Sequence, residues 1–227
     1  MAFRKKATFI LEYNPDILIV PECEHPDKLT IDFGKQKPTN ILWFGSNQNK
    51  GLAVFSFNKY TLRVLESHNP ELKLIIPIAV SSELFDFTLY AIWANHPTDP
   101  DGKYIEQVWK AINQYDEFLS NKQTMLIGDF NSNTIWDKKS RIGNHTDVVN
   151  RLREKEIFSS YHLFHKQIQG KEMHPTIYMY RHKNKPYHID YCFVSKDLAD
   201  RITNVEVGDY DYWSKFSDHM PVIVSIN

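Results

Sequence analysis

The sequence predicts one α+β domain over residues 1–227, built from two packed β-sheets with helices on the outside. Alternation of apolar and polar residues, typical of half-buried strands, recurs along the chain, whereas helical periodicity is rarer. We find no internal repeat, low-complexity tract or Pro/Gly-rich linker that would mark a second domain. Hydrophobic residues make up 42% of the 227 residues, which is enough for one core.

The first strand candidates lie in the N-terminal part of the chain. Residues 17–20 form a continuous apolar run that ends at Pro21 and Glu22. Residues 41–44 and 52–55 flank a polar stretch with the composition of a hairpin turn. Alternating or apolar runs predict the later strands at residues 72–80, 85–93, 124–130, 176–180, 187–195 and 221–226. Pro77, in the first of these, indicates an edge or a bulge.

Three segments carry apolar residues at helical spacing. The clearest, at residues 105–119, has Val108 and Ile112 on one face. The other two lie at residues 3–11 and 148–152. Together with the strands, these segments predict sheets that are covered on the outside by a few helices.

The charge and composition exclude some functions. A formal net charge of −1 gives no global argument for a polyanion partner, because non-specific nucleic-acid binders usually carry a basic excess. No run approaches the ~18 apolar residues of a membrane span. The first residues resemble the charged start of a signal peptide, but Glu12 interrupts the apolar stretch that follows. We expect a cytoplasmic protein in which Cys23 and Cys192 are buried, reduced thiols.

The segment from Gly128 to Asn131 ends a predicted strand, so Asp129 and Asn131 point the same way while Phe130 faces the opposite side. A carboxylate and a carboxamide side by side can orient a water molecule, with Asp129 accepting its proton and Asn131 fixing its position. The alternative is a strand that ends in a polar Asx turn, and the four residues alone do not decide between the two.

A second acid, Asp190, shares a face with His188 at the start of an apolar strand. A buried acid needs a partner, and we expect His219 to be that partner, because a carboxylate sets the tautomer of a histidine and stabilises its cationic form. The pair would donate a proton to a pentavalent phosphorus centre or stabilise charge on it. Taken alone, His219 is more often a structural histidine near a turn, and Asp218 a turn residue.

Glu22 emerges from the core at the end of a strand. Magnesium takes one or two protein carboxylates and keeps several waters and a substrate phosphate oxygen. Glu22 as the first ligand, with Asp218 nearby directly or through water, fits that pattern, and Mn²⁺ is the expected substitute for Mg²⁺. The alternative for a lone Glu22 is a solvated loop acid.

These segments, in this order and separation, resemble the endonuclease/exonuclease/phosphatase superfamily, whose fold is that of pancreatic deoxyribonuclease, from Asp16 to Pro221. The resemblance implies a four-layer α/β/β/α sandwich of two mostly antiparallel sheets with flanking helices. It assigns roles in phosphoester hydrolysis to seven residues, namely Glu22 and Asp218 at the divalent metal, Asp129 and Asn131 at the attacking water, Asp190 and His219 as an oriented pair, and His96 at the phosphate.

The start of the chain departs from the pattern of this family. Members normally have a first core strand that ends in an asparagine ligand of the metal, whereas this chain opens with the segment that begins at Phe3. Either the natural start lies upstream, or this form lacks a central strand and one ligand. In both cases we expect the strand that ends at Glu22 to have one unpaired edge within these residues.

The leading hypothesis is a magnesium-dependent phosphodiesterase, in particular a nuclease that hydrolyses DNA or RNA by metal-assisted attack of water. The alternatives are a phosphatase or phosphodiesterase acting on a small phosphoester, such as a nucleotide or lipid headgroup, and a binding module with a degenerate site. Aromatic residues could stack on bases, but a core cap explains them at least as well. A basic stretch could follow a phosphate backbone, but a solvated loop is slightly favoured there. These residues are Trp136, Tyr210, Tyr212 and Trp213, and Lys166, Lys171, Arg181, Lys183 and Lys185.

Overall fold

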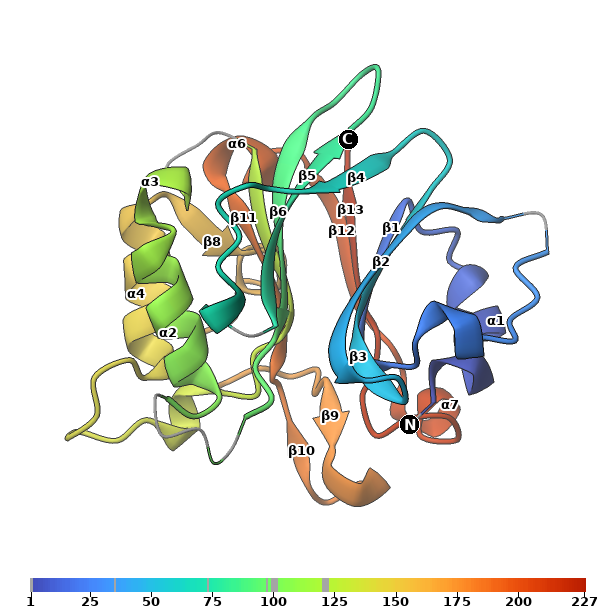
Figure 1. Cartoon of the computed structure of the whole chain (residues 1–227). Helices are drawn as coiled ribbons and strands as arrows, with labels where there is room; N and C mark the ends of the chain where they lie inside the picture. The colour runs from blue at the N-terminus through green and yellow to red at the C-terminus, as the bar shows by residue number, and fades with distance from the viewer. Residues whose placement is uncertain (1, 35, 73, 97, 99–101, 120–122) are drawn as a thin grey trace.

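The computed structural model describes residues 2–34, 36–72, 74–96, 98, 102–119 and 123–227. It has two main layers of β-sheet, with helices on the outer side of each (Figure 1). This arrangement confirms the predicted α+β class. Among the described residues, no helix is long and apolar enough to cross a membrane.

One layer is a six-stranded sheet in the order β4-β5-β6-β7-β11-β8. Its strands are β4 (Thr61–Val64), β5 (Ile75–Ser81), β6 (Phe87–Trp93), β7 (Thr124–Asp129), β8 (Ile157–Ser159) and β11 (Asp190–Ser195). Only the β6–β7 pair is parallel, and every other neighbour is antiparallel. The sheet is therefore mostly antiparallel, as the family resemblance implies.

The other layer is divided. A three-stranded sheet has the order β1-β3-β2, and β12 pairs separately with β13. These strands are β1 (Ile17–Cys23), β2 (Pro38–Asn47), β3 (Lys50–Phe57), β12 (Ile202–Val207) and β13 (Val222–Ile226). Within the described part of the chain, β1 pairs only with β3 and β13 only with β12. The strand that ends near Glu22 thus has the unpaired edge that the sequence predicts.

Three apolar clusters hold the layers together. Helices α2 (Ile105–Gln114) and α4 (His145–Glu154) pack against the outer face of the six-stranded sheet, with α3 (Asp116–Leu119) beside them. The inner face of the same sheet packs against β3. On the far side of β1 and β3 lie α1 (Ala7–Leu11) and the short turn before it. The order of layers is therefore helix, sheet, sheet, helix.

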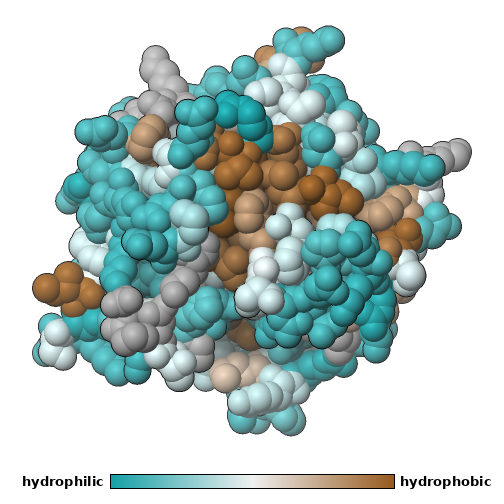
Figure 2. All heavy atoms as spheres, in the orientation of Figure 1, coloured by the Kyte–Doolittle hydropathy of each residue, from teal (hydrophilic) through white to brown (hydrophobic). Residues whose placement is uncertain are grey.

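The core between the sheets is only partly closed. Figure 2 shows apolar side chains gathered in the middle of one face, with hydrophilic residues on both sides of them. Several apolar residues that pack on this core are half-buried, among them Ile17 and Ile19 on β1 and Val224 and Ile226 on β13. Within the described residues, β1 and β13, which carry these side chains, each have one unpaired edge.

Some predicted elements have different bounds in the structure. The strand expected at residues 72–80 begins at Ile75, because residues 70–72 form a turn of 3₁₀-helix. The helix expected at residues 105–119 divides at Tyr115 into α2 and α3. The strand expected at residues 187–195 splits into β11 and the short β10 (Pro186–Tyr187), which pairs with β9 (Ile177–Tyr178). The sequence did not predict β4, β8, β12 or the short helices α5 (Ser160–His165), α6 (Lys196–Ala199) and α7 (Tyr210–Trp213).

Candidate active site

The site is built at the ends of the neighbouring strands β7 and β11, where Asp129 pairs directly with Asp190. Gly128 precedes Asp129 with φ of +144°, and a Cβ atom there would lie 1.9 Å from the carbonyl oxygen of Ile92. Only glycine allows β7 to approach β6 this closely. Phe130 turns the other way and is fully buried in the core, as the alternation along the strand predicts.

Asp129 and Asn131 contact each other directly. The backbone N–H of Asn131 donates to Asp129 Oδ1 at 2.8 Å, and its side-chain Nδ2 donates to Oδ2 at 2.8 Å. Asn131 has φ of +47°, a left-handed conformation that asparagine tolerates better than most residues. The carboxylate and carboxamide are therefore side by side, as expected, and the oxygen of the carboxamide is left to face a ligand.

His219 and Asp190 also meet. His219 Nδ1 lies 3.0 Å from Asp190 Oδ2 and 3.2 Å from Oδ1. The backbone holds the segment of His219 against β9: residues Ile177 and His219 form an isolated bridge, and the N–H of Tyr178 donates to the carbonyl of Asp218 at 2.8 Å. The contact between the histidine and the acid thus comes from segments that are 29 residues apart.

Burial and charge shift the protonation of this group. Burial, together with the negative charge of Asp190, raises the pKa of Asp129 well above its ordinary value. Burial disfavours the charged form of His219, but the carboxylates of Asp190 and Asp129 outweigh it and raise the pKa of the imidazole. Two acids and a histidine with a raised pKa therefore lie together, with Asp129 buried and Asp190 and His219 partly exposed, and the two carboxylates repel each other.

Ligand atoms of Asp129, Asp190 and His219 all lie within 4.8 Å of one another. Glu22 is close enough for its charge to act on Asp129, and the charge of Asp218 acts on His219. Carboxylate and carboxamide oxygens are the donors that Mg²⁺ prefers, and a cation would relieve the repulsion between the acids. The residues present therefore fit a hard divalent cation, whereas burial raises the pKa of the nearby Cys23 thiol and makes it a poor ligand.

Two lysines that the sequence did not single out reach the same acids. Lys50 Nζ lies 2.6 Å from Glu22 Oε1, and Lys6 Nζ donates to Ser217 Oγ at 3.3 Å. Burial lowers the pKa of Lys6, although the charges of Asp218, Glu22 and Asp190 oppose this. No local pattern marks these lysines, because they come from the first turn of the chain and from the β2–β3 hairpin.

Thr176, to which the sequence gave no role, is fully buried between the segment of Asp190 and the segment of His219. Its Oγ1 accepts from the backbone N–H groups of Ile189 and Asp190 at 2.9 and 3.0 Å, and its carbonyl accepts from the N–H of Met220 at 2.7 Å. Thr176 is thus bonded to the backbone beside both Asp190 and His219. Because these N–H groups bond to Thr176 and not to a strand, the strand predicted at residues 187–195 is interrupted here.

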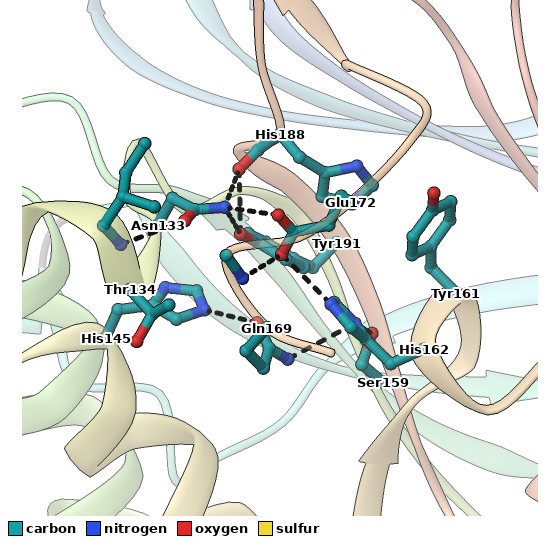
Figure 3. Close-up of polar contacts among 12 residues, drawn as sticks. Asn133, Thr134, His145, Ser159, Tyr161, His162, Gln169, Glu172, His188 and Tyr191 are labelled. Atoms are coloured by element: carbon teal, nitrogen blue, oxygen red, sulfur yellow. Dashed lines mark hydrogen bonds and ion pairs between the residues drawn. The ribbon is translucent and has the colours of Figure 1, made fainter. Parts of the chain in front are cut away.

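A polar network lies beside the site (Figure 3). Asn133 Nδ2 donates to the carbonyl of His188 at 2.9 Å, to the hydroxyl of Tyr191 at 3.2 Å and to the carboxylate of Glu172 at 3.2 Å. Burial opposes the charged form of Glu172, but hydrogen bonds from His162 and from the backbone lower its pKa to about 2. The network joins the loop after Asp129 to the residues before Asp190. His188 belongs to this network and lies outside strand β11.

The other predicted residues have separate environments. His96 follows the end of β6 and is half-buried. Of the aromatic residues, Trp136 and Tyr212 are exposed, whereas Trp213 is fully buried, which favours for Trp213 the alternative that it caps the core. Arg181, Lys183 and Lys185 lie on or beside the turn between β9 and β10, whereas Lys166 and Lys171 follow α5, so the basic stretch is not one continuous surface segment.

Comparisons with known proteins place the fold. A scan against protein-family models and a search of curated proteins found no match. Among solved structures, the chain is similar to an AP endonuclease from Archaeoglobus fulgidus, with 16% identity and a TM-score of 0.72 over 100% of this chain and 96% of that one. It is also similar to the 3′ phosphatase NExo from Neisseria bound to a product DNA hairpin, with 20% identity and a TM-score of 0.69 over 99% and 94%.

A third similar structure is the endonuclease domain of TRAS1, a telomere-specific non-LTR retrotransposon, with 17% identity and a TM-score of 0.66 over 100% of this chain and 92% of that one. At these identities the likeness shows the fold. The fold implied by the resemblance to the endonuclease/exonuclease/phosphatase superfamily is thereby confirmed.

Proposed function

We propose that this protein is a metal-dependent phosphoric ester hydrolase, and specifically a nuclease that hydrolyses phosphodiesters of DNA or RNA. The observation that carries the proposal is the convergence of Asp129, Asp190 and His219 within 4.8 Å at two adjacent strand ends, with Asn131 bonded to Asp129. The similar solved structures include two described as endonucleases and one described as a 3′ phosphatase bound to DNA.

Glu22 and Asp218 are the residues that would hold the divalent metal, at the edge of the trio formed by Asp129, Asp190 and His219. Magnesium, or manganese in its place, would supply a Lewis acid for a non-bridging phosphate oxygen. The oxygen donors of the site favour either ion over a softer metal. Because the pKa of Asp129 is raised in the absence of a cation, a positive charge nearby is also what would return this carboxyl to its basic form.

Asp129 then acts as the base. Its two carboxylate oxygens accept from Asn131, which fixes the orientation of the carboxylate. A water molecule held between the Asp129 carboxylate and the Asn131 carboxamide loses its proton to the carboxylate as its oxygen attacks phosphorus. The surrounding burial of Asp129 keeps other water away from this step.

His219 faces the charge that develops on the phosphate. Asp190 bonds to Nδ1 of His219, which leaves Nε2 to donate to the phosphate or to the leaving oxygen. The raised pKa of His219 keeps the ring protonated near neutral pH, so the donor is a cation. His96, half-buried at the end of β6, would contact the phosphate from another side.

Nucleic acid is the substrate that we favour, because the exposed Trp136 and Tyr212 and the basic β9–β10 turn flank the segments that carry the site. A small phosphoester is the second candidate. The test is hydrolysis of plasmid DNA, single-stranded DNA, RNA and bis(p-nitrophenyl) phosphate in parallel, each with Mg²⁺ and with excess chelator.

We expect metal-dependent cleavage of at least one nucleic acid. Hydrolysis of the small ester alone would identify a small-molecule phosphodiesterase. Absence of all hydrolysis, with binding of nucleic acid retained, would contradict an enzymatic function and favour a binding module with a degenerate site.

A further inference from the structure

We propose that Lys50 is a phosphate-contacting residue of the candidate active site. Its ammonium group forms an ion pair with Glu22 until the Glu22 carboxylate binds a divalent metal. The inference rests on the proposed function, in that the anion is the phosphate of a substrate. It adds a residue that comes from the β2–β3 hairpin, outside the four segments that first indicated the site.

The position of the ammonium group is the first argument. Lys50 Nζ lies 2.6 Å from Glu22 Oε1 and 5.4 Å from the centre of the Trp93 ring. Trp93 ends β6 and pairs with Asp129 across the parallel β6–β7 contact. The positive charge of Lys50 therefore stands between the candidate metal ligand and the strand end that carries the candidate base.

The backbone on both sides of the ion pair is specialised. The β1–β3 pairing is irregular between Val20 and Cys23, and Glu22, inside that bulge, has φ of +61°. Bulges re-aim a side chain, and a left-handed conformation at a glutamate costs free energy. On the facing strand, a Cβ atom on Gly51 would lie 2.4 Å from the Trp43 ring, so glycine is required directly after Lys50.

Stability does not explain this arrangement. The side chain of Lys50 is 52% exposed and that of Glu22 is 41% exposed. An ion pair exposed to this degree contributes little to the free energy of folding, because water solvates both charges and the long side chains lose conformational freedom. A contact that adds little stability yet sits on a strained, re-aimed residue is better explained by what it does for a ligand.

Binding of a metal would change the partner of Lys50. A divalent cation and an ammonium group repel each other and compete for the same carboxylate. Once Glu22 binds the metal, the flexible four-carbon stem lets the ammonium move a short way and donate to a non-bridging oxygen of the phosphate that the metal holds. No covalent bond forms or breaks in this exchange.

The exchange makes two opposite predictions for Lys50→Gln, which removes the charge and keeps much of the side-chain length. Mn²⁺ should bind several-fold more tightly, because one cation that competes for Glu22 is gone. With Mn²⁺ saturating, inorganic phosphate should bind about tenfold more weakly, the loss of one charge-assisted hydrogen bond. Calorimetric titration of the folded proteins measures both affinities without any turnover.

Two variants serve as references. Lys50→Arg keeps the charge and should retain phosphate binding within a few-fold. Lys196→Gln removes an exposed lysine of the same kind, whose ammonium lies 3.0 Å from Glu156, and should leave both affinities as in the wild type.

An unchanged Mn²⁺ affinity or an unchanged phosphate affinity in Lys50→Gln would overturn the proposal, as would a wild type that binds no Mn²⁺. Failure of the proposed function has a different signature: the wild type would hydrolyse no phosphoester, while the Mn²⁺ and phosphate affinities would still respond to Lys50 as described.

Discussion

The two sheet layers of this protein hold their candidate active-site residues in different ways. In the sheet that is continuous from β4 to β8, Asp129 ends β7 and is paired on both sides, with Trp93 and with Asp190. Asp190 begins the neighbouring β11, and its N–H donates to Thr176 Oγ1.

Glu22 lies near the end of β1, in the three-stranded sheet, and His219 lies just before β13, in the two-stranded sheet. Within the described residues, no pairing joins β1 to β13. There, the side chains of Lys50 and Asp190 contact Glu22 and His219, and backbone hydrogen bonds join the segment of His219 to Thr176 and to β9.

The difference in strand pairing indicates which property each layer controls, the rate of chemistry or the affinity for metal. A strand that is hydrogen-bonded on both edges moves little, and it suits groups that must meet reacting atoms with precise geometry. A strand with an open edge can adjust, and it suits groups that exchange one cation for another. We therefore expect substitutions at the end of the continuous sheet to lower the rate of chemistry. His219 belongs with this group, because its ring is bonded to Asp190 at the end of the continuous sheet. Substitutions of Glu22 and at the open edge of β1 should change metal affinity and stability.

The largest effect should come from the residues at the chemistry itself. Asp129→Asn and His219→Ala should each lower the rate of hydrolysis by about 100-fold or more, the usual loss for a general base or a charge-stabilising group. Single-turnover kinetics at saturating Mg²⁺ measures this step. Asp200→Asn, at an exposed acid after α6, is the control and should retain the wild-type rate. Near-normal turnover in Asp129→Asn would remove Asp129 as the base.

The continuity of the six-stranded sheet depends on Gly128. Gly128→Ala should lower the free energy of unfolding by about 3 kcal/mol or more, because the added Cβ atom meets the Ile92 carbonyl and the backbone conformation excludes other residues. Gly34→Ala, where φ is also positive but nothing lies within 4 Å, should cost only about 1 kcal/mol. Urea denaturation measures both, and equal losses would contradict the close approach of β6 and β7.

The sequence predicted best what depends on neighbouring residues. The β2–β3 hairpin follows from a polar turn between apolar runs, and β7, which ends at Asp129, follows from the apolar run at residues 125–127. The β12 strand was not predicted because several of its residues are exposed, so its apolar alternation is weak. The three-residue β8 is too short to show any period.

Contacts between distant segments could not be predicted from local patterns. Pairing of Asp190 with His219 was expected from chemistry and a resemblance, since a buried acid needs a partner. The contacts of Thr176 and Lys50 had no such signal: a threonine and a lysine are ordinary in any loop, and only the folded chain shows what they contact. The split of the strand at residues 187–195 has the same origin, because its N–H groups bond to Thr176.

Mildly acidic pH should lower the free energy of unfolding, because it protonates buried histidines of the polar network beside the six-stranded sheet. Burial lowers the pKa of His145 and of His188 to about 4, whereas an exposed histidine titrates near 6.5. Between these values each of the two histidines binds a proton in the unfolded chain but not in the folded one, so their contribution to the free energy of unfolding falls as the pH drops through 6.5 toward 4. The loss is at most about 3 kcal/mol for each histidine.

Denaturation curves at a series of pH values from neutral to mildly acidic test this. Because His188→Gln and His145→Gln each remove one such group, each variant should have a shallower pH dependence than the wild type. A wild type whose stability is flat over this interval, or variants that lose stability as steeply, would show that these histidines do not control the acid response.

The smallest effect concerns the open edge of β1. Adding a short β-forming segment that ends in asparagine at the N-terminus should raise the melting temperature and the affinity for Mg²⁺. Each 1 kcal/mol gained from newly paired backbone groups raises the melting temperature of a chain of this size by about 2–4 °C. The control is a segment of the same length made of glycine and serine. Equal melting temperatures and equal metal affinities would mean that the edge does not accept a strand.

The central claim is that side chains from both layers form one metal-dependent site. A magnesium titration of the hydrolysis rate, compared between the wild type and Glu22→Gln, tests it most directly. We expect no hydrolysis in excess chelator and full recovery on adding Mg²⁺. The midpoint for Glu22→Gln should shift to a Mg²⁺ concentration about tenfold higher or more, because a ligand from the divided layer is lost. Full activity in chelator, or the same midpoint for both proteins, would contradict the claim.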